Sequence, residues 1–108
     1  MTNSVVIDFS RIEGPVYTGR PRGEGLRKKY GLDEIDTSPT SVDVLIPEST
    51  YSLSSSFFLG MFGESVVRAG TRDRFFQKYH FSASPIVSTV IESCVSRALQ
   101  EKGLFAKE

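Results

Sequence analysis

Residues 42–70 read VDVLIPESTYSLSSSFFLGMFGESVVRAG, a sequence typical of a strand, a loop and a helix. Val42–Ile46 is apolar at four of five positions and is followed by Pro47, which predicts a central strand covered on both faces. Ser55–Ala69 has apolar residues at helical spacing, and Gly70 follows as a C-cap. This stretch therefore predicts the centre of an α/β domain.

Two glycines inside this predicted helix, Gly60 and Gly63, indicate close packing. Each costs about 1 kcal/mol relative to alanine in a helix interior. We expect the helix backbone at these positions to approach a sheet or another helix closely.

Upstream, the short β-branched segment Ser4–Phe9 predicts a first strand. Ser10–Arg22 contains two glycines and two prolines, so it is expected to be a long loop with room for a short hairpin. Glu24–Tyr30 predicts a short helix that ends at Gly31.

Downstream, the aromatic segment Phe75–Phe81 (FFQKYHF) predicts a third strand. The last helix is expected to be capped by Ser84, to begin at Pro85 and to end at Gly103. The order is then β-α-β-α-β-α, which favours an α/β fold, a layered sheet with right-handed crossovers.

The bulk properties predict one small domain, residues 1–103, followed by a frayed tail, residues 104–108. The chain has 108 residues, 39% of them hydrophobic, and 13 basic residues balance 13 acidic ones. This balance argues against nucleic acid or an anionic membrane as the partner. The sequence shows no secretory signal and no apolar run long enough to span a membrane, so we expect a cytoplasmic protein of bacterial type.

Two motifs in this order resemble the STAS-like domain family of unknown function. Its Ser-Ser-Phe and the helix after it are matched by Ser55, Ser56, Phe57, Phe62, Gly63, Val67 and Arg68. Its upstream Gly-Pro loop and Ser-Gly-Glu-x-Phe-Arg segment are matched by Gly14–Pro15, Gly23, Glu24, Leu26 and Arg27. The chain departs from the family at Arg22, Ser54 and Glu64, where the motifs have serine, glycine and glycine.

This resemblance implies a small, single-domain STAS-like sheet and a protein-docking role. STAS domains proper include anti-anti-sigma factors, which are switched by phosphorylation of a serine at the start of the second helix. Ser55 takes that position here, with Ser54 in place of the family's aspartate and Phe57 in place of its glycine. By the same analogy, the partner is expected to be a protein such as an ATPase or a kinase.

The serine run has a structural interpretation and a functional one. A serine at a helix start accepts a bond from a free N–H and contributes about 1 kcal/mol. Alternatively, a partner kinase phosphorylates Ser55 or Ser56, which adds negative charge that a helix N-terminus tolerates. On that hypothesis Ser55→Asp weakens partner binding without unfolding the domain, and Ser54, Ser55, Ser56 and Phe57 form the partner-binding site.

The segment Gly19–Gly25 (GRPRGEG) is expected to be a surface loop, since it matches no phosphate-binding motif. Its arginines belong to a basic cluster that contains one acidic residue, Glu24. This cluster is a solvated face, a contact for an acidic protein surface or ligand, or, as the last alternative, a contact for nucleic acid. The residues expected to bind there are Arg20, Arg22, Glu24 and Arg27.

No assembled catalytic or metal site is evident in the sequence, so we expect no enzyme activity, cofactor or metal. His80 is expected on an exposed strand position, and Cys94 in the core as an inert thiol. Asp8 and Asp43 are among four carboxylates that no spacing pairs. The sequence therefore predicts a regulatory or adaptor domain that docks to a protein, and its oligomeric state stays open. The alternative is a small-ligand or nucleotide-binding domain on the same surface, which nucleotides would stabilise in a thermal-shift assay.

Overall fold

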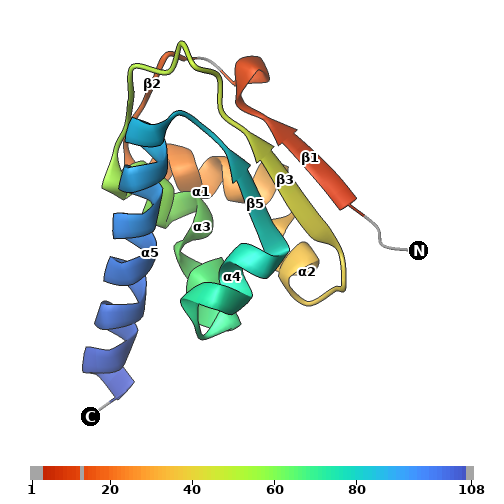
Figure 1. Ribbon diagram of the computed structural model, residues 1–108. Coiled ribbons are helices and arrows are strands. Elements are labelled where there is room, and N and C mark those ends of the chain that lie inside the picture. Colours follow the sequence, from red (N-terminus) through yellow and green to blue (C-terminus); the bar gives the residue numbers. More distant parts are fainter. Residues whose placement is uncertain (1–3, 13, 107–108) are drawn as a thin grey trace.

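The computed structural model describes residues 4–12 and 14–106 and shows an α/β fold built on a three-stranded parallel sheet (Figure 1). Its strands are β1 (Ser4–Asp8), β3 (Ser41–Leu45) and β5 (Tyr79–Ser82), in the order β1-β3-β5. A second, two-stranded parallel sheet pairs β2 (Val16–Tyr17) with β4 (Ser52–Leu53). The α/β class predicted from the sequence is confirmed.

The helices connect these strands. They are the 3-10 turn η1 (Phe9–Arg11), α1 (Arg20–Lys29), α2 (Leu32–Asp36), α3 (Ser55–Ala69), α4 (Arg72–Lys78) and α5 (Pro85–Ala106). Figure 1 shows α1 and α3 behind the sheet, and α5 on the far side of α3.

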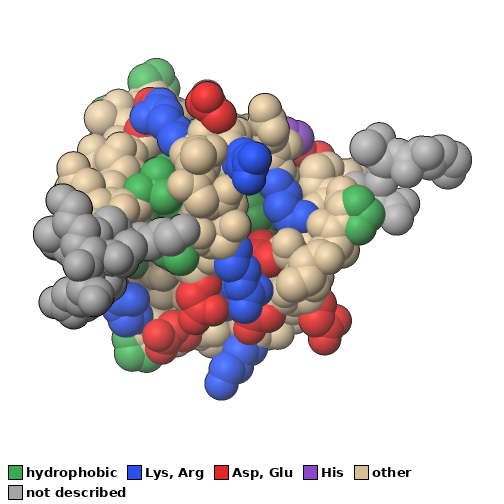
Figure 2. Space-filling model, turned by 90° about the horizontal axis from the view of Figure 1, so that it is seen from below, with side chains coloured by type: hydrophobic (Ala, Val, Ile, Leu, Met, Phe, Trp, Pro, Cys, Tyr) green, Lys and Arg blue, Asp and Glu red, His purple; other side chains and the backbone are tan. Residues whose placement is uncertain are grey.

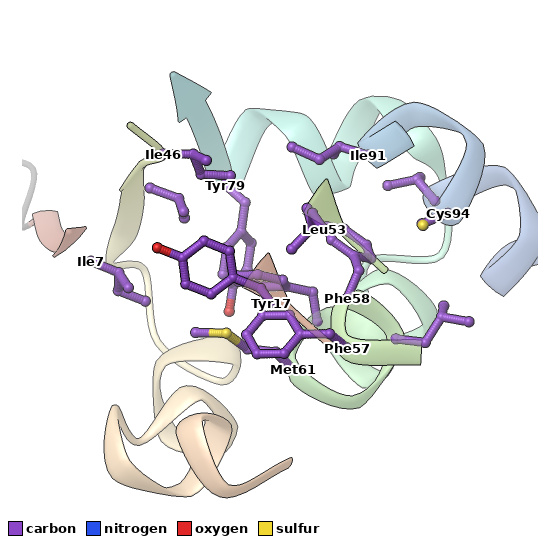
Figure 3. Packing of buried hydrophobic residues seen from close by; sticks show 14 of the residues in the cluster. Ile7, Tyr17, Ile46, Leu53, Phe57, Phe58, Met61, Tyr79, Ile91 and Cys94 are labelled. Carbon is purple, nitrogen blue, oxygen red and sulfur yellow. The ribbon is translucent and has the colours of Figure 1, made fainter. Parts of the chain in front are cut away.

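The core lies between the sheet and these helices (Figure 3). Ile7, Val42 and Val44 point from the sheet into this layer and are fully buried. From α3, Phe57, Phe58 and the residues one turn later pack against them. The sheet therefore buries one face against α1 and α3.

The prediction that the central strand is covered on both faces is wrong. β3 is central, but its residues alternate, since Val44 is buried and Leu45 is 39% exposed. A short apolar run does not reveal which face its members point to. Among the described residues, no helix or strand covers the second face of the sheet.

The helix predicted at Ser55–Ala69 is confirmed, together with its two ends. The Phe57 N–H donates to Ser54 Oγ at 3.1 Å, and Gly70 adopts a left-handed conformation with φ of 84°. The close approach expected at Gly60 is also found. A Cβ there would lie 2.4 Å from the Arg20 carbonyl oxygen, and one at Gly23 would lie 2.3 Å from the Phe57 carbonyl oxygen. These two glycines let α1 and α3 pack closely.

Gly63 does not serve this purpose. The nearest atom to a Cβ built there belongs to Leu59 of the same helix, at an ordinary 3.7 Å. The expectation of close approach is therefore right for Gly60 and wrong for Gly63.

The strand predicted over Phe75–Phe81 is largely a helix. Thr71 caps α4 by accepting a bond from the Arg74 N–H at 3.2 Å, and β5 begins only at Tyr79. The Phe75 and Tyr79 rings stack one helical turn apart, with centroids 5.0 Å apart. Aromatic residues favour strands in general, and here the N-cap and this i, i+4 pair outweigh that preference.

Two further boundaries differ from the predictions. The segment Gly19–Gly25 is not a surface loop, because α1 begins at Arg20 with Pro21 in its first turn. The last helix does not end at Gly103, because α5 runs to Ala106. A glycine inside a helix costs only about 1 kcal/mol, which favourable neighbours offset. The segment predicted as a loop, Ser10–Arg22, contains β2, which pairs with β4 and forms no hairpin.

Candidate functional site

The serine run lies at the start of α3, at the predicted place, but its members have different surroundings. Ser54 is the N-cap, so the structural interpretation of this serine is confirmed. Ser55 is partly buried, and its hydroxyl accepts a hydrogen bond from the Arg97 guanidinium at 3.4 Å. Ser56 is exposed.

Phe57 is not available to a partner. It is fully buried, and its ring packs against those of Phe9 and Tyr17 (Figure 3). The interpretation of Phe57 as a binding residue is wrong, because the first inward position of α3 faces the core.

The charged residues of the predicted basic cluster on α1 differ in their surroundings. Arg20 and Glu24 are exposed. Arg22 donates to the Val16 carbonyl oxygen at 3.0 Å, and its guanidinium lies 5.5 Å from the centroid of the Tyr17 ring. Arg22 therefore helps to fasten α1 to β2.

Arg27 is 5% exposed, so the expectation that it belongs to a surface cluster is wrong. Its guanidinium donates to Asp36 at 2.8 Å, to Asp33 at 2.7 and 3.0 Å, and to Ser65 Oγ at 2.8 Å. It also donates to the Met61 carbonyl oxygen at 2.9 Å. Arg27 thus ties α1 to both α2 and α3.

A buried polar network forms around this arginine. It consists of Arg27, Asp36, Ser65 and Tyr79. Asp36 accepts from Tyr79 Oη at 2.6 Å and from Ser65 Oγ at 2.7 Å. Burial raises the pKa of Tyr79, and the hydrogen bond to Asp36 raises it further. Burial alone would lower the pKa of Arg27, but its hydrogen bonds to Asp36 and Asp33 outweigh this and raise it.

Members of the network satisfy one another, which favours a structural role. A cavity of about 70 Å³ lies beside it, lined in part by Arg68 and Lys78, and has room for a few water molecules. At the rim, Asp33 and Glu64 approach Arg27 from the solvent side. Seen from below, acidic and basic side chains lie next to one another on the surface (Figure 2).

The bare face of the sheet carries a different set of residues. Two rows of its outward positions cross all three strands, Val6–Asp43–His80 and Asp8–Leu45–Ser82. Val6 is 56% exposed and Leu45 39% exposed. Figure 1 shows α1 and α3 on the opposite side of the sheet, α2 and α4 near the lower end of its strands, and α5 to its left. We call this set of six residues the bare face.

Two polar features mark the bare face. His80 Nδ1 lies 3.2 Å from Asp43 Oδ1, although the two residues are 37 positions apart. His80 is exposed, as predicted, but its carboxylate partner was missed because only the pairing of β3 with β5 reveals it. Hydrogen bonds from the Ser10 hydroxyl and N–H lower the pKa of Asp8, so this carboxylate is ionised at neutral pH.

Other chemical groups have structural surroundings. Cys94 is 2% exposed and burial raises the pKa of its thiol, in agreement with the predicted core position. Within residues 4–12 and 14–106, no group of three or more His, Cys, Asp or Glu side chains is arranged to hold a metal ion. The described helices include none of the length and apolar character that crossing a membrane requires.

Comparisons of the chain with protein-family models, curated proteins and solved structures find no match. The resemblance to the STAS-like family therefore stays a prediction from the motifs.

Proposed function

We propose that this chain is a non-catalytic docking domain of regulatory or adaptor type, and that it binds a partner protein through the bare face. The observation that carries the proposal is the uncovered side of a parallel sheet, with Val6 and Leu45 exposed on it. Parallel sheets occur almost only where both faces are covered. A partner would supply the missing layer.

The chemistry of the bare face favours one kind of partner. Its two rows carry two carboxylates, Asp8 and Asp43, and neither row contains lysine or arginine. Val6 and Leu45 supply the apolar contact. The complementary surface is an amphipathic helix whose apolar stripe is flanked by basic side chains, because helices are the usual cover of a parallel sheet.

The buried polar groups support a docking role over a catalytic one. Ser65 and Tyr79 carry hydroxyl groups near the cavity, and both are held inside the network. Their hydroxyls are hydrogen-bonded to Asp36 and are closed to a substrate. The polar side chains of the sheet that a partner can reach are those of the bare face.

The experiment places a photo-crosslinking residue at position 45, and at Ile86 as a control. Ile86 is apolar and 79% exposed but lies on α5. Position 45 is expected to trap a partner in the native cell. The purified partner should then bind the double variant V6K/L45K at least about tenfold more weakly than wild type, and I86K equally well. A partner that binds V6K/L45K with wild-type affinity would exclude the bare face.

The phosphorylation switch is a separate part of the proposal. A phosphate on Ser55 would meet Arg97 and the free N–H groups of α3, and Ser56 is exposed to a kinase. If the partner also reaches this surface, Ser55→Asp weakens its binding and leaves the fold intact. Equal affinities in a titration would confine the contact to the bare face.

A further inference from the structure

A groove lies beside the β5 edge of the three-stranded sheet, between β5, α4 and α5. Its lining consists of Arg72, Phe76, Phe81, Ser88, Ile91 and Glu92, and its volume is about 310 Å³. This volume is at the lower end of those seen for ligand sites, about 300–1,000 Å³. We call it the β5 groove.

The floor of the β5 groove is apolar. Ile91 is 2% exposed, and Phe76 and Phe81 are partly buried. Phe81 also packs against Phe75 and Phe62 of the core, with ring centroids 6.0 and 5.3 Å apart. The floor is therefore continuous with the core and fixed in shape.

The rim of the groove carries two opposite charges that neutralise each other. Arg72 of α4 and Glu92 of α5 form an ion pair, and the Arg72 guanidinium also lies 5.5 Å from the centroid of the Phe76 ring. Since the two charges are paired, the groove favours a neutral apolar group over an ion.

β5, which contributes Phe81 to the groove, is an edge strand of the described sheet. The Ile46 N–H donates to the Ser82 carbonyl oxygen at 2.8 Å, so the main-chain groups of Ser82 face β3. Successive residues of a strand direct these groups to opposite edges. The N–H and C=O of Phe81 are therefore directed away from β3, where the described sheet has no further strand.

From these features we infer that the β5 groove binds an extended segment of a partner protein. The segment pairs with Phe81 as a fourth strand and inserts one apolar side chain between Phe76 and Ile91. A strand edge beside an apolar pocket is the arrangement by which domains add a peptide strand to a sheet. Main-chain bonds supply affinity and the pocket selects the side chain.

This inference goes beyond the proposed function. It uses the edge of the sheet and not its bare face, and its occupant is extended and not helical. The two sites are tested by different variants, so that one can fail while the other stands.

The test uses acetylated, amidated pentapeptides of sequence Thr-Val-X-Val-Thr, titrated into the ¹⁵N-labelled full chain and followed by amide spectra. With X as Leu or Phe, we expect shifts at Phe81 and Ser88. With X as Asp, binding should weaken at least about tenfold, because a charge is buried in the groove. With the amide of X N-methylated, binding should weaken to a similar extent, because one main-chain hydrogen bond is lost.

Two variants of α5 provide the matched comparison. Ser88→Trp fills the groove and is expected to abolish the shifts, while Thr89→Trp, at an exposed neighbouring position outside the lining, should preserve them. V6K/L45K should bind the peptides like wild type.

Three results would overturn the inference. One is the absence of shifts at Phe81 and Ser88 with the Leu and Phe peptides at millimolar concentration. A second is that the N-methylated peptide binds the wild-type chain undiminished, or that the Ser88→Trp variant binds the Leu and Phe peptides undiminished. The third is the appearance of the same shifts with protein concentration alone, which would make the occupant a second copy of the chain.

Discussion

The two faces of the three-stranded sheet are built from alternate residues of the same strands, yet they differ in almost every property. Val44 is fully buried under α3, and Leu45, the next residue, is 39% exposed. One face has two helices packed on it, and the other has none among the described elements. Neighbouring apolar residues therefore serve different purposes, packing on one side and contact with a partner on the other.

The polar residues of the two faces differ in the same way. On the covered side, the Asp36 side chain is 3% exposed and holds Arg27 and Tyr79. On the bare face, the Asp43 side chain is 42% exposed and faces His80. Each aspartate has a partner, but only the buried one is needed by the fold, because an exposed pair is worth little in water.

The largest effect is expected on the covered side, for Asp36→Asn. This change leaves the Arg27 charge buried without its closest enclosed counterion and should lower the free energy of unfolding by about 3–5 kcal/mol. Urea denaturation followed by circular dichroism measures the loss.

Asp33→Asn is the matched control. Asp33 also binds Arg27, at 2.7 Å, but its side chain is 62% exposed. Its loss should cost no more than about 1 kcal/mol. Equal losses for the two variants would contradict the assignment of the buried network as the structural one.

A smaller loss is expected where α1 crosses α3 above the covered side. Gly60→Ala places a methyl group against the Arg20 backbone, which has to move, and should cost about 1–3 kcal/mol. Gly63→Ala adds the same group at ordinary van der Waals distance from Leu59 of the same helix and should stabilise the protein by up to about 1 kcal/mol. Thermal unfolding measures both, and a stabilised Gly60→Ala would refute the close crossing.

The two faces can be compared directly at adjacent positions. Val44→Ala removes buried methyl groups and should cost about 2 kcal/mol. Leu45→Ala removes more atoms but from a half-exposed side chain, so its cost should stay within about 1 kcal/mol. If Leu45→Ala proves the more costly change in a denaturation series, the outer face is packed and is not bare.

The elements with local signals could be predicted from the sequence. Ser54 and Gly70 mark the ends of α3, and Ser84 and Pro85 mark the start of α5, because caps act over a few residues. The aromatic run at Phe75–Phe81 could not be assigned correctly, since its pattern fits a strand and a helix alike. Gly60 was expected to approach a neighbour, but only the fold shows that the neighbour is α1.

The residues brought together by the fold could not be predicted. Arg27 joins a basic run in the sequence, and only the packing of α1 on α2 and α3 turns it into a buried ion-pair partner. The Asp43–His80 pair and the β5 groove depend on strand order, which no local pattern encodes. The bare face is not evident from the sequence, because apolar residues at four of the five positions of Val42–Ile46 predict cover on both sides.

The smallest expected effect concerns the first turn of α3, the helix that covers the inner face. Ser54→Ala removes the acceptor for the Phe57 N–H, so the unfolding free energy should fall by about 1 kcal/mol. Ser56→Ala, two residues later and exposed, should change it by less than about 0.5 kcal/mol. Amide hydrogen exchange sharpens the comparison, because Phe57 should lose protection in the first variant and keep it in the second. Equal protection of the Phe57 amide in both variants would mean that the core contacts of Phe57 alone stabilise this turn, and that the serine run is not needed for the structure.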